Sequence, residues 1–468
     1  MFPPLRFPTL AAWALSTLAV LTAFAAPGPR DEAAIAEVAA KKRTEAKAAW
    51  WGFDPSDATS ALQGAIRSGA RRVLVENLGS PWIVDRIQLA SDQEIVFEKG
   101  VVVQAKRGAF HGKTDSLFSA SGVSHLALTG PGATLRMWKA DYTTSDYTKS
   151  EWRHAIALRS CTDVSITGLT IMDSGGDGIY LGAARRGETN KGVTLRDLVL
   201  RNHHRQGISV ISAEDLLIER CALVDTGGTA PQAGIDFEPN DAEDRLVNIV
   251  MRDCRSDRNR GCAYEFHLPK LNRSTRPVSI RLERCTSKGG RRSVAFVTGN
   301  AEADAVGGRV EFIDCRFDDS ELEAITIRRK PARGCLVRFA NCTITNPAAK
   351  QPTIAPISIG SIPGNSEDVG GVEWAGCTIT DSLARRPLAY LDGTGELRLI
   401  EVTGTLTVTH EGKTTRYELN RALLDEWFPS PPVRRFPNGK TNLAAPVADK
   451  ATVTTTKTLP AGTPAKKK

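Results

Sequence analysis

The sequence predicts an all-β protein, a right-handed single-stranded parallel β-helix with a short N-terminal capping helix. Two observations predict it. A strand motif recurs with its last positions 23 to 35 residues apart, and a second short strand follows each copy after about ten to fifteen residues. Self-similarity at such a period is typical of a repeat architecture in which each unit stacks on the next.

The first strand series alternates apolar and polar residues, turns at a small or polar residue, and ends on Leu or Cys. This alternation indicates that one face of each strand is buried. The copies of this series are 164–169, 193–198, 216–221, 249–254, 280–285, 310–315, 337–342 and 372–377.

The second strand series is shorter and is separated from the first by glycine-rich turns such as 173–176 and 225–228. Strands so short and so numerous must pair with the coils above and below, which gives parallel sheets around a narrow apolar interior. The copies are 178–181, 207–210, 234–237, 263–266, 294–297, 324–327, 357–359 and 388–390.

Six of the nine cysteines fall at one internal position of successive coils, where earlier coils carry Leu169 and Leu198. Stacked coils lie about 4.8 Å apart, so distance alone permits bridging, but parallel side-chain directions oppose it. We therefore expect mostly free thiols that act as small apolar groups. These cysteines are Cys221, Cys254, Cys285, Cys315, Cys342 and Cys377.

The two ends of the chain differ from the repeat. Residues 1–25 resemble a signal peptide, with Arg6 before an apolar stretch and a small-x-small cleavage site at 23–25. We expect 26–50 to be a linker or a solvated helix, 51–430 the β-helix, and 431–468 a disordered basic tail. The protein is then secreted or periplasmic, with no membrane span after removal of the signal.

Two short helices are expected to close the ends of the solenoid, because its terminal sheet edges need cover. The first is 57–66, with Asp57 as its N-cap, and the second is 419–427.

Charge and motif content exclude several function classes. The net charge is +8, but without Arg6 and the tail from Lys440 onward the body carries only +2. No basic-aromatic face suggests nucleic acid, and no Cys/His spacing matches zinc. Glycine motifs lie between strands, with no following helix to hold phosphate.

The chain resembles the pectate lyase and polygalacturonase superfamily. Residues 57–135 are similar to its entry region, through 57–66, 87–103 and 126–132, and residues 154–395 are similar to its β-helix repeats. The resemblance implies that a polysaccharide binds in a groove on one flank and is cleaved or epimerised there. The chain departs from the polygalacturonase pattern at Gly176-Asp177-Gly178, which lacks a preceding Asn-Thr, and it has no Gly-His-Gly. Fold alone does not fix chemistry.

Alternation in the second strand series predicts which side chains point outward. One outward column contains Tyr180, Ser209, Asp236, Glu265, Ala295 and Thr326, and the next contains Glu238, His267, Val297 and Arg328. Asp236, Glu238, Glu265 and His267 should therefore form one patch, and we expect them to be the catalytic set. Tyr264 is expected inside.

Three carboxylates side by side suit acid and base catalysis. Mutual repulsion should raise at least one carboxyl pKa, which makes a general acid, while another serves as base or nucleophile. A separation near about 5 Å would suit a retaining glycosidase and a wider one an inverting enzyme. Clustered carboxylates also suit Ca²⁺, the one cofactor weighed, and a lyase would use it to neutralise a uronate. The remaining alternative is a solvated acidic strand with incidental salt bridges.

Residues around this patch are expected to bind substrate. Basic turn residues stack as a rim whose arginines suit carboxylate or sulfate, so an anionic polysaccharide is one expected partner. They equally suit neutralising the acids or solvating a turn. Tyr180 is a candidate sugar-stacking platform, and Asp177 either caps its turn or extends the carboxylate set. The full set is Asp177, Tyr180, His203, His204, Arg205, Arg260, Arg292 and Arg328.

The sequence therefore predicts an exported carbohydrate-active enzyme, a glycoside hydrolase or polysaccharide lyase. The alternatives are a sugar epimerase using the same groove and a non-catalytic β-helix adhesin or glycan-binding surface protein.

Overall fold

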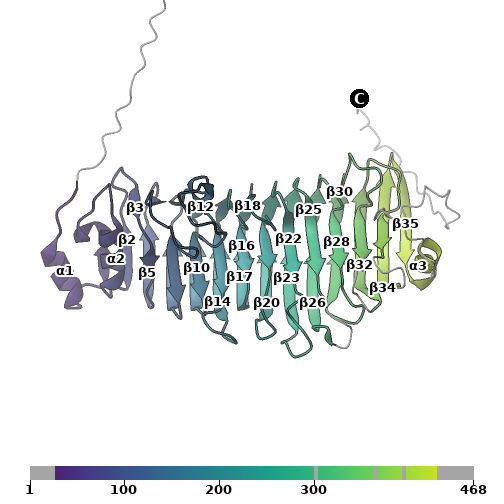
Figure 1. Cartoon of the computed structure of the whole chain (residues 1–468), viewed down its shortest axis with the longest axis horizontal. Helices are drawn as coiled ribbons and strands as arrows, with labels where there is room; N and C mark the ends of the chain where they lie inside the picture. The colour runs from purple at the N-terminus through teal and green to yellow at the C-terminus, as the bar shows by residue number, and fades with distance from the viewer. Residues whose placement is uncertain (1–26, 300–303, 362–366, 393–396, 430–468) are drawn as a thin grey trace, which may run out of the picture.

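The computed structural model describes residues 27–299, 304–361, 367–392 and 397–429, and it is a right-handed parallel β-helix. Coils stack along the long axis from α1 at one end to α3 at the other (Figure 1). The expected signal peptide and basic tail lie outside the described residues. No helix within those ranges is both long and apolar enough to span a membrane.

Each coil contributes strands to three faces. The first two faces belong to one 24-stranded sheet that turns a corner, and the third is an 11-stranded sheet. The first face consists of β1 (Glu45–Lys47), β2 (Arg72–Val75), β5 (Gln93–Phe97), β8 (Ser124–Thr129), β11 (Thr162–Thr167), β14 (Asn190–Arg196), β17 (Ala213–Glu219), β20 (Leu246–Arg252), β23 (Val278–Glu283), β26 (Gly308–Ile313), β29 (Leu336–Ala340), β32 (Val369–Thr380), β34 (Leu399–His410) and β35 (Lys413–Leu419).

The second face carries three- and four-residue strands that follow the corner, and β32 extends into it. They are β3 (Trp82–Val84), β6 (Val102–Ala105), β9 (Thr134–Arg136), β12 (Thr170–Met172), β15 (Val199–Arg201), β18 (Ala222–Val224), β21 (Arg255–Asp257), β24 (Thr286–Lys288), β27 (Arg316–Asp318) and β30 (Thr343–Thr345).

The third face, the 11-stranded sheet, carries the predicted site. Its strands are β4 (Ile87–Gln88), β7 (Phe118–Ser121), β10 (Ile156–Arg159), β13 (Ile179–Gly182), β16 (Ile208–Val210), β19 (Ile235–Phe237), β22 (Cys262–His267), β25 (Arg292–Val297), β28 (Ile325–Arg328), β31 (Ile357–Gly360) and β33 (Leu388–Leu391).

The interior is a set of stacked apolar columns. Ile235 and Tyr264 are fully buried neighbours, as the alternation predicts. Aromatic rings stack coil on coil: Phe312 and Phe339 have centroids 4.6 Å apart, and Phe339 and Trp374 4.5 Å. A continuous core of this kind grows by one layer with each coil, so the described coils share one core.

The predicted cysteine column is confirmed. All nine cysteines are free and buried. Adjacent members contact each other through the backbone; for example, the Cys221 N–H donates to Cys254 Sγ at 3.3 Å.

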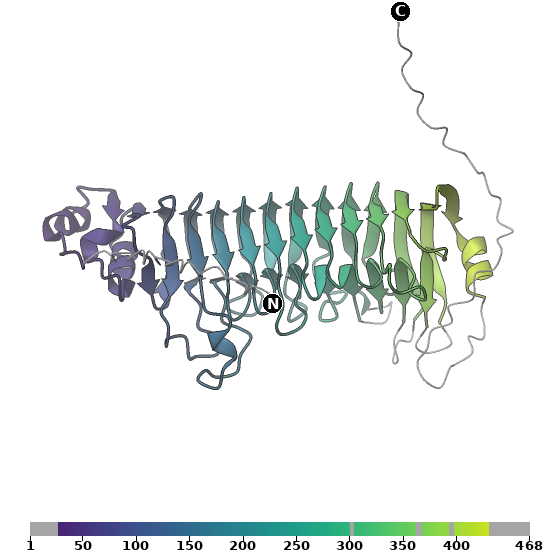
Figure 2. The same ribbon diagram turned by 90° about the horizontal axis from the view of Figure 1, so that it is seen from above.

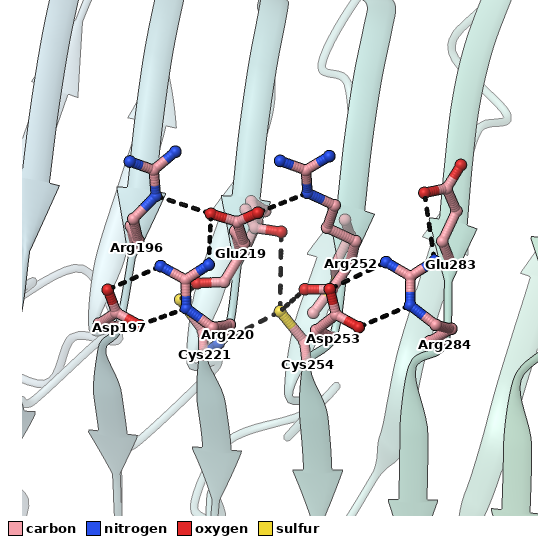
Figure 3. Close-up of polar contacts among 12 residues, drawn as sticks. Arg196, Asp197, Glu219, Arg220, Cys221, Arg252, Asp253, Cys254, Glu283 and Arg284 are labelled. Atoms are coloured by element: carbon pink, nitrogen blue, oxygen red, sulfur yellow. Dashed lines mark hydrogen bonds and ion pairs between the residues drawn. The ribbon is translucent and has the colours of Figure 1, made fainter.

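Charged ladders cover the outside of the first corner, where residues such as Asp197, Arg220 and Asp253 adopt a left-handed conformation with φ of 54°, 52° and 55°. Arg220 donates to both oxygens of Asp197, at 2.7 and 2.9 Å. One strand position earlier, Glu219 accepts from Arg252 at 2.6 Å and pairs with Arg196 at 2.7 Å (Figure 3). Acid and base alternate from coil to coil, so charges on this surface are compensated locally.

The ends are closed by short elements, with three corrections. Residues 45–50, expected in the linker, belong to the folded body, because β1 pairs with β2 and is followed by the 3₁₀ turn η1 (Ala48–Trp51). A helix before them, α1 (Glu32–Ala39), is N-capped by Asp31.

The capping helix α2 (Thr59–Arg67) starts later than predicted, with Ala58 at the N-cap position. The Ala58 N–H bonds to Ile83 O, which ties the helix start to β3, and Asp57 instead pairs with Lys106 at 2.6 Å. At the other end, α3 (Arg421–Trp427) is capped by the Asn420 side chain and so begins two residues after 419.

Candidate active site

The predicted register of the third face is correct. Asp236 on β19 lies opposite Ser209 on β16 and Glu265 on β22. Glu238 follows β19 and His267 ends β22. The outward-facing acids therefore gather on one flank of the helix, over two adjacent strands.

Asp236 lies at the bottom of this cluster rather than on an open surface. It is 1% exposed, and its Oδ2 accepts from Gln206 Nε2 at 2.7 Å while Oδ1 has no hydrogen-bond partner. Burial, followed by the charges of Glu265 and Glu238, raises the pKa of Asp236 well above its usual value. Asp236 cannot touch a substrate in this conformation, which corrects the expectation that it is a surface catalytic group.

Glu265 is the accessible member of the pair. Its side chain is half-buried, and burial raises its pKa to about 7, with Glu238 adding repulsion and the Cys262 thiol donating a hydrogen bond that opposes the rise. A carboxyl group that titrates near neutrality is protonated in part of the molecules at physiological pH. That is the property required of a general acid.

Arg205 forms contacts with acidic residues of the cluster, so its charge is compensated within the protein. Its Nη2 donates to Glu238 Oε2 at 2.6 Å, and Nη1 donates to Gln206 Oε1 at 2.9 Å. Nη1 also lies 3.8 Å from Asp177 Oδ2, and only 12% of the side chain is exposed. In this conformation Arg205 is not an open substrate clamp, because Nη1 and Nη2 donate to protein acceptors and most of the side chain is buried.

Asp177 extends the carboxylate set but is fully buried. Its Oδ1 accepts from the Gln206 N–H at 3.2 Å, and Oδ2 lies 3.2 Å from His154 Nδ1. The same His154 ring stacks on Tyr180, with centroids 4.7 Å apart and planes 12° from parallel. Arg159 lies 5.2 Å from the Tyr180 centroid. Tyr180 points outward as predicted, but its ring is engaged by protein groups and is not an open stacking platform.

The two turn histidines do not form a binding rim. His203 is fully buried, its Nδ1 is 2.8 Å from Ser174 Oγ, and burial lowers its pKa to about 3. It is a structural group, which corrects its assignment to substrate binding. His204 is half-buried and its Nε2 is 2.9 Å from Thr229 Oγ1. Arg260 is exposed, and its aliphatic stem packs over Gly227.

Arg292 and Arg328 flank the carboxylate cluster on the later coils and share Glu323. Arg292 Nη2 is 3.2 Å from each Glu323 oxygen, and Arg328 Nη2 is 3.5 Å from Oε1. Glu323 is buried, while the two arginines are 21% and 23% exposed. One carboxylate cannot balance two guanidinium groups, so this end of the site keeps a positive charge.

His267 is exposed at the end of β22. Within the described ranges, neither a hydrogen bond nor an ion pair joins it to Glu238. The expected acid-base pair is thus not assembled, although both groups border Glu265.

Three residues of this network were missed from the sequence: Gln206, Cys262 and Glu323. Each lies two positions before the first inward residue of its strand, in a column that also holds Asp177, Ala233 and Arg292. The predicted columns contain only the outward residues that follow the inward position. Considering those that precede it as well would have found these three. The chain also contains one pair of consecutive aspartates, at 318–319. This pair is not part of the candidate site, because Asp318 lies on the second face and pairs with Arg316 at 2.9 Å.

The cluster does not fit Ca²⁺. Arg205 occupies the position between Glu238 and Asp177 that a cation would take. Among the described residues there is also no group of three or more His, Cys, Asp or Glu arranged to hold a metal ion. No step below is routed through a metal.

The chain belongs to the right-handed β-helix family, whose model, the right handed beta helix region, matches residues 134–382. Among curated proteins it is 24% identical over 268 residues to the SPbeta prophage-derived uncharacterized protein YorA of Bacillus subtilis, covering 51% of this chain and 45% of YorA. It is 33% identical over 98 residues to the uncharacterized protein YclG of the same organism, covering 19% and 16%. The chain thus spans less than half the length of these curated relatives.

Solved structures of similar shape include enzymes that act on polysaccharides, a tailspike bound to a hexasaccharide and PfbA, a surface adhesin of Streptococcus pneumoniae. They include the A-module of the Azotobacter vinelandii mannuronan C-5 epimerase AlgE4 (TM-score 0.54, 12% identity, 78% of this chain and 96% of that chain). A family 28 exopolygalacturonase of Yersinia enterocolitica has a TM-score of 0.55 at 12% identity over 78% of each chain. The tailspike of Escherichia coli bacteriophage HK620 in complex with a hexasaccharide has 0.58 at 12%, over 77% and 65%. At these identities the likeness shows the fold.

Proposed function

We propose that the protein is an exported, polysaccharide-acting enzyme, and that it is a glycoside hydrolase with Glu265 as its general acid. The observation that carries this proposal is Glu265, a partly exposed acid paired in register with buried Asp236, whose pKa is raised to about 7 by burial and by the charge of Glu238. A solvated structural strand has no need of such a pair.

The roles follow from accessibility. Glu265 is partly exposed on the flank of the helix and donates its proton to the glycosidic oxygen. Glu238, a half-buried carboxylate held by Arg205, stabilises the positive charge that develops on the sugar and acts as base or nucleophile. Asp236 does not touch the substrate, because it is buried and its Oδ2 accepts from Gln206, which Arg205 also holds. Arg292 and Arg328 provide the residual positive charge that favours an anionic glycan beside the acids.

Hydrolysis is preferred over metal-assisted elimination because Arg205 fills the place of the cation that a uronate lyase would use. The similarity in shape to an exopolygalacturonase and to a glycan-bound tailspike supports a polysaccharide as the partner.

The test is a panel of polysaccharides that includes polygalacturonate and mannuronan, incubated with the full chain. New reducing ends without ultraviolet-absorbing products indicate hydrolysis, unsaturated products indicate elimination, and changed sugar configuration without cleavage indicates epimerisation. Glu265→Gln should lower turnover by at least about a hundredfold. Glu283→Gln is the matched control, because Glu283 is also half-buried and paired with an arginine, but lies on the first face. Equal loss in both variants would remove Glu265 from the mechanism.

A further inference from the structure

Trp152 is an anomaly of the surface. Among the described residues, Trp152 is the large apolar side chain that is exposed, with 44% of its surface accessible to solvent. The other tryptophans of that part are buried or lie beneath a guanidinium group. Trp51, Trp82 and Trp374 are buried, while Arg107, Arg43 and Arg386 lie 3.9, 5.5 and 5.6 Å from the centroids of Trp138, Trp50 and Trp427. Within the same residues, the Trp152 ring has no aromatic or cationic partner.

The backbone that carries Trp152 is held firmly. Its N–H donates to Ser150 Oγ at 3.1 Å. The next residue, Arg153, is fully buried, and its Nε donates to Phe110 O at 2.7 Å. Arg153 anchors the long excursion between β9 and β10, which carries the 3₁₀ turn η2 (Asp141–Thr143) and projects from the body (Figure 2). The indole is thus presented from a fixed position.

Two contacts place Trp152 beside the candidate site. A Cβ added to Gly176 would lie 2.7 Å from Glu151 O and 2.8 Å from Arg153 N, so this segment packs directly on the turn that leads into Asp177. The side chain of Glu151 lies 3.8 Å from Arg205 Nε, and Arg205 in turn holds Glu238. A short chain of contacts therefore joins the backbone at Trp152 to the acids.

We propose that Trp152 is a stacking platform for a pyranose ring of the same polysaccharide whose bond lies at Glu265. The proposal rests on the proposed function and adds a subsite toward the N-terminal coils. The substrate class is therefore a glycan chain long enough to occupy Glu265 and Trp152 together. Tyr180 does not take this role, because His154 stacks on its ring and Arg159 lies nearby.

The chemistry suits the placement. One face of a pyranose presents C–H bonds, which pack on an aromatic ring while the hydroxyl groups remain in water. Because the backbone at Trp152 is already held, only its side-chain torsions lose freedom when a sugar binds. An exposed tryptophan without such a ligand leaves a large apolar surface in water, which the other described tryptophans of this chain avoid.

The test uses the full chain on an immobilised panel of plant, algal and bacterial polysaccharides. Trp152→Ala should weaken retention of the retained polysaccharide about tenfold, and Trp152→Phe should weaken it less. Trp50→Ala is the matched control, because Trp50 is also partly exposed but lies in the N-terminal cap. A further expectation is that Trp152→Ala raises KM for long chains while leaving that for di- and trisaccharides unchanged.

The outcomes separate the two proposals. Wild-type retention of a glycan with the same retention by Trp152→Ala overturns the platform and leaves the site at Glu265 standing. Turnover lost in Glu265→Gln but retention lost only in Trp152→Ala supports both. A wild-type chain that retains no member of the panel contradicts both. Equal weakening by Trp50→Ala and Trp152→Ala would show a general effect on folding and would also overturn the platform.

Discussion

The Arg205 Nη2 donates to Oε2 of Glu238 at 2.6 Å, and the two residues belong to adjacent coils of the third face. The same guanidinium approaches fully buried Asp177, so it is the cation that lets several acids share one flank. An arginine in this position stabilises the fold and sets the charge of the site at the same time.

Removing this cation should be strongly destabilising. Arg205→Ala removes the guanidinium group that faces both Glu238 and buried Asp177, and we expect a loss of about 3–5 kcal/mol in the free energy of unfolding, measured by chemical denaturation. Arg220→Ala is the control. Arg220 forms a bidentate pair with exposed Asp197, and Glu219, its second partner, still has Arg196 and Arg252, so the loss should be much smaller (Figure 3). A similar loss in the free energy of unfolding in both variants would show that Arg205 contributes no more to stability than an exposed arginine does.

Stability should depend on pH through Glu265. Its folded pKa is about 7, above the usual value of a glutamate, so the folded state binds more protons than the unfolded state between those two values. The contribution is therefore fully present at low pH and is lost as pH rises through about 7, by at most about 3 kcal/mol. Glu265→Gln should flatten this part of the stability-pH curve. An unchanged slope in the variant would mean that Glu265 ionises normally.

The cysteine thiols should be unreactive in the native protein. All nine are buried and free, so a thiol reagent should label none of them quickly before unfolding and all nine afterwards. Intact mass measurement without reductant should show no loss of hydrogen from disulfide formation. Disulfides between adjacent coils would contradict the parallel side-chain directions of the column.

Much of the fold could be predicted because the repeat carries its own register. Once Ile235 and Tyr264 are taken as inward, Asp236 and Glu265 must be outward neighbours, and they are. Strand alternation is a local property, so it can be read from the sequence alone.

The burial of the site could not be predicted in the same way. Asp236 is covered because Gln206 and Arg205 reach it from a turn that precedes the neighbouring strand, and the path of such turns is set by tertiary contacts. His203 was misassigned for the same reason, since the turn directs it to Ser174 instead of the groove. Trp152 lies in an excursion outside the repeat, where periodicity gives no information.

The pH dependence of kcat/KM tests the central claim most directly, using the glycan that the panel identifies. If Glu265 donates the proton, wild-type kcat/KM should fall as pH rises above about 7, tenfold for each further unit, because the pKa of the free enzyme's acid sets that limb. In Glu283→Gln the limb should remain, and in Glu265→Gln the residual rate should lose it. A wild-type rate that stays constant across that range, or a Glu265→Gln variant that keeps the limb, would contradict the account.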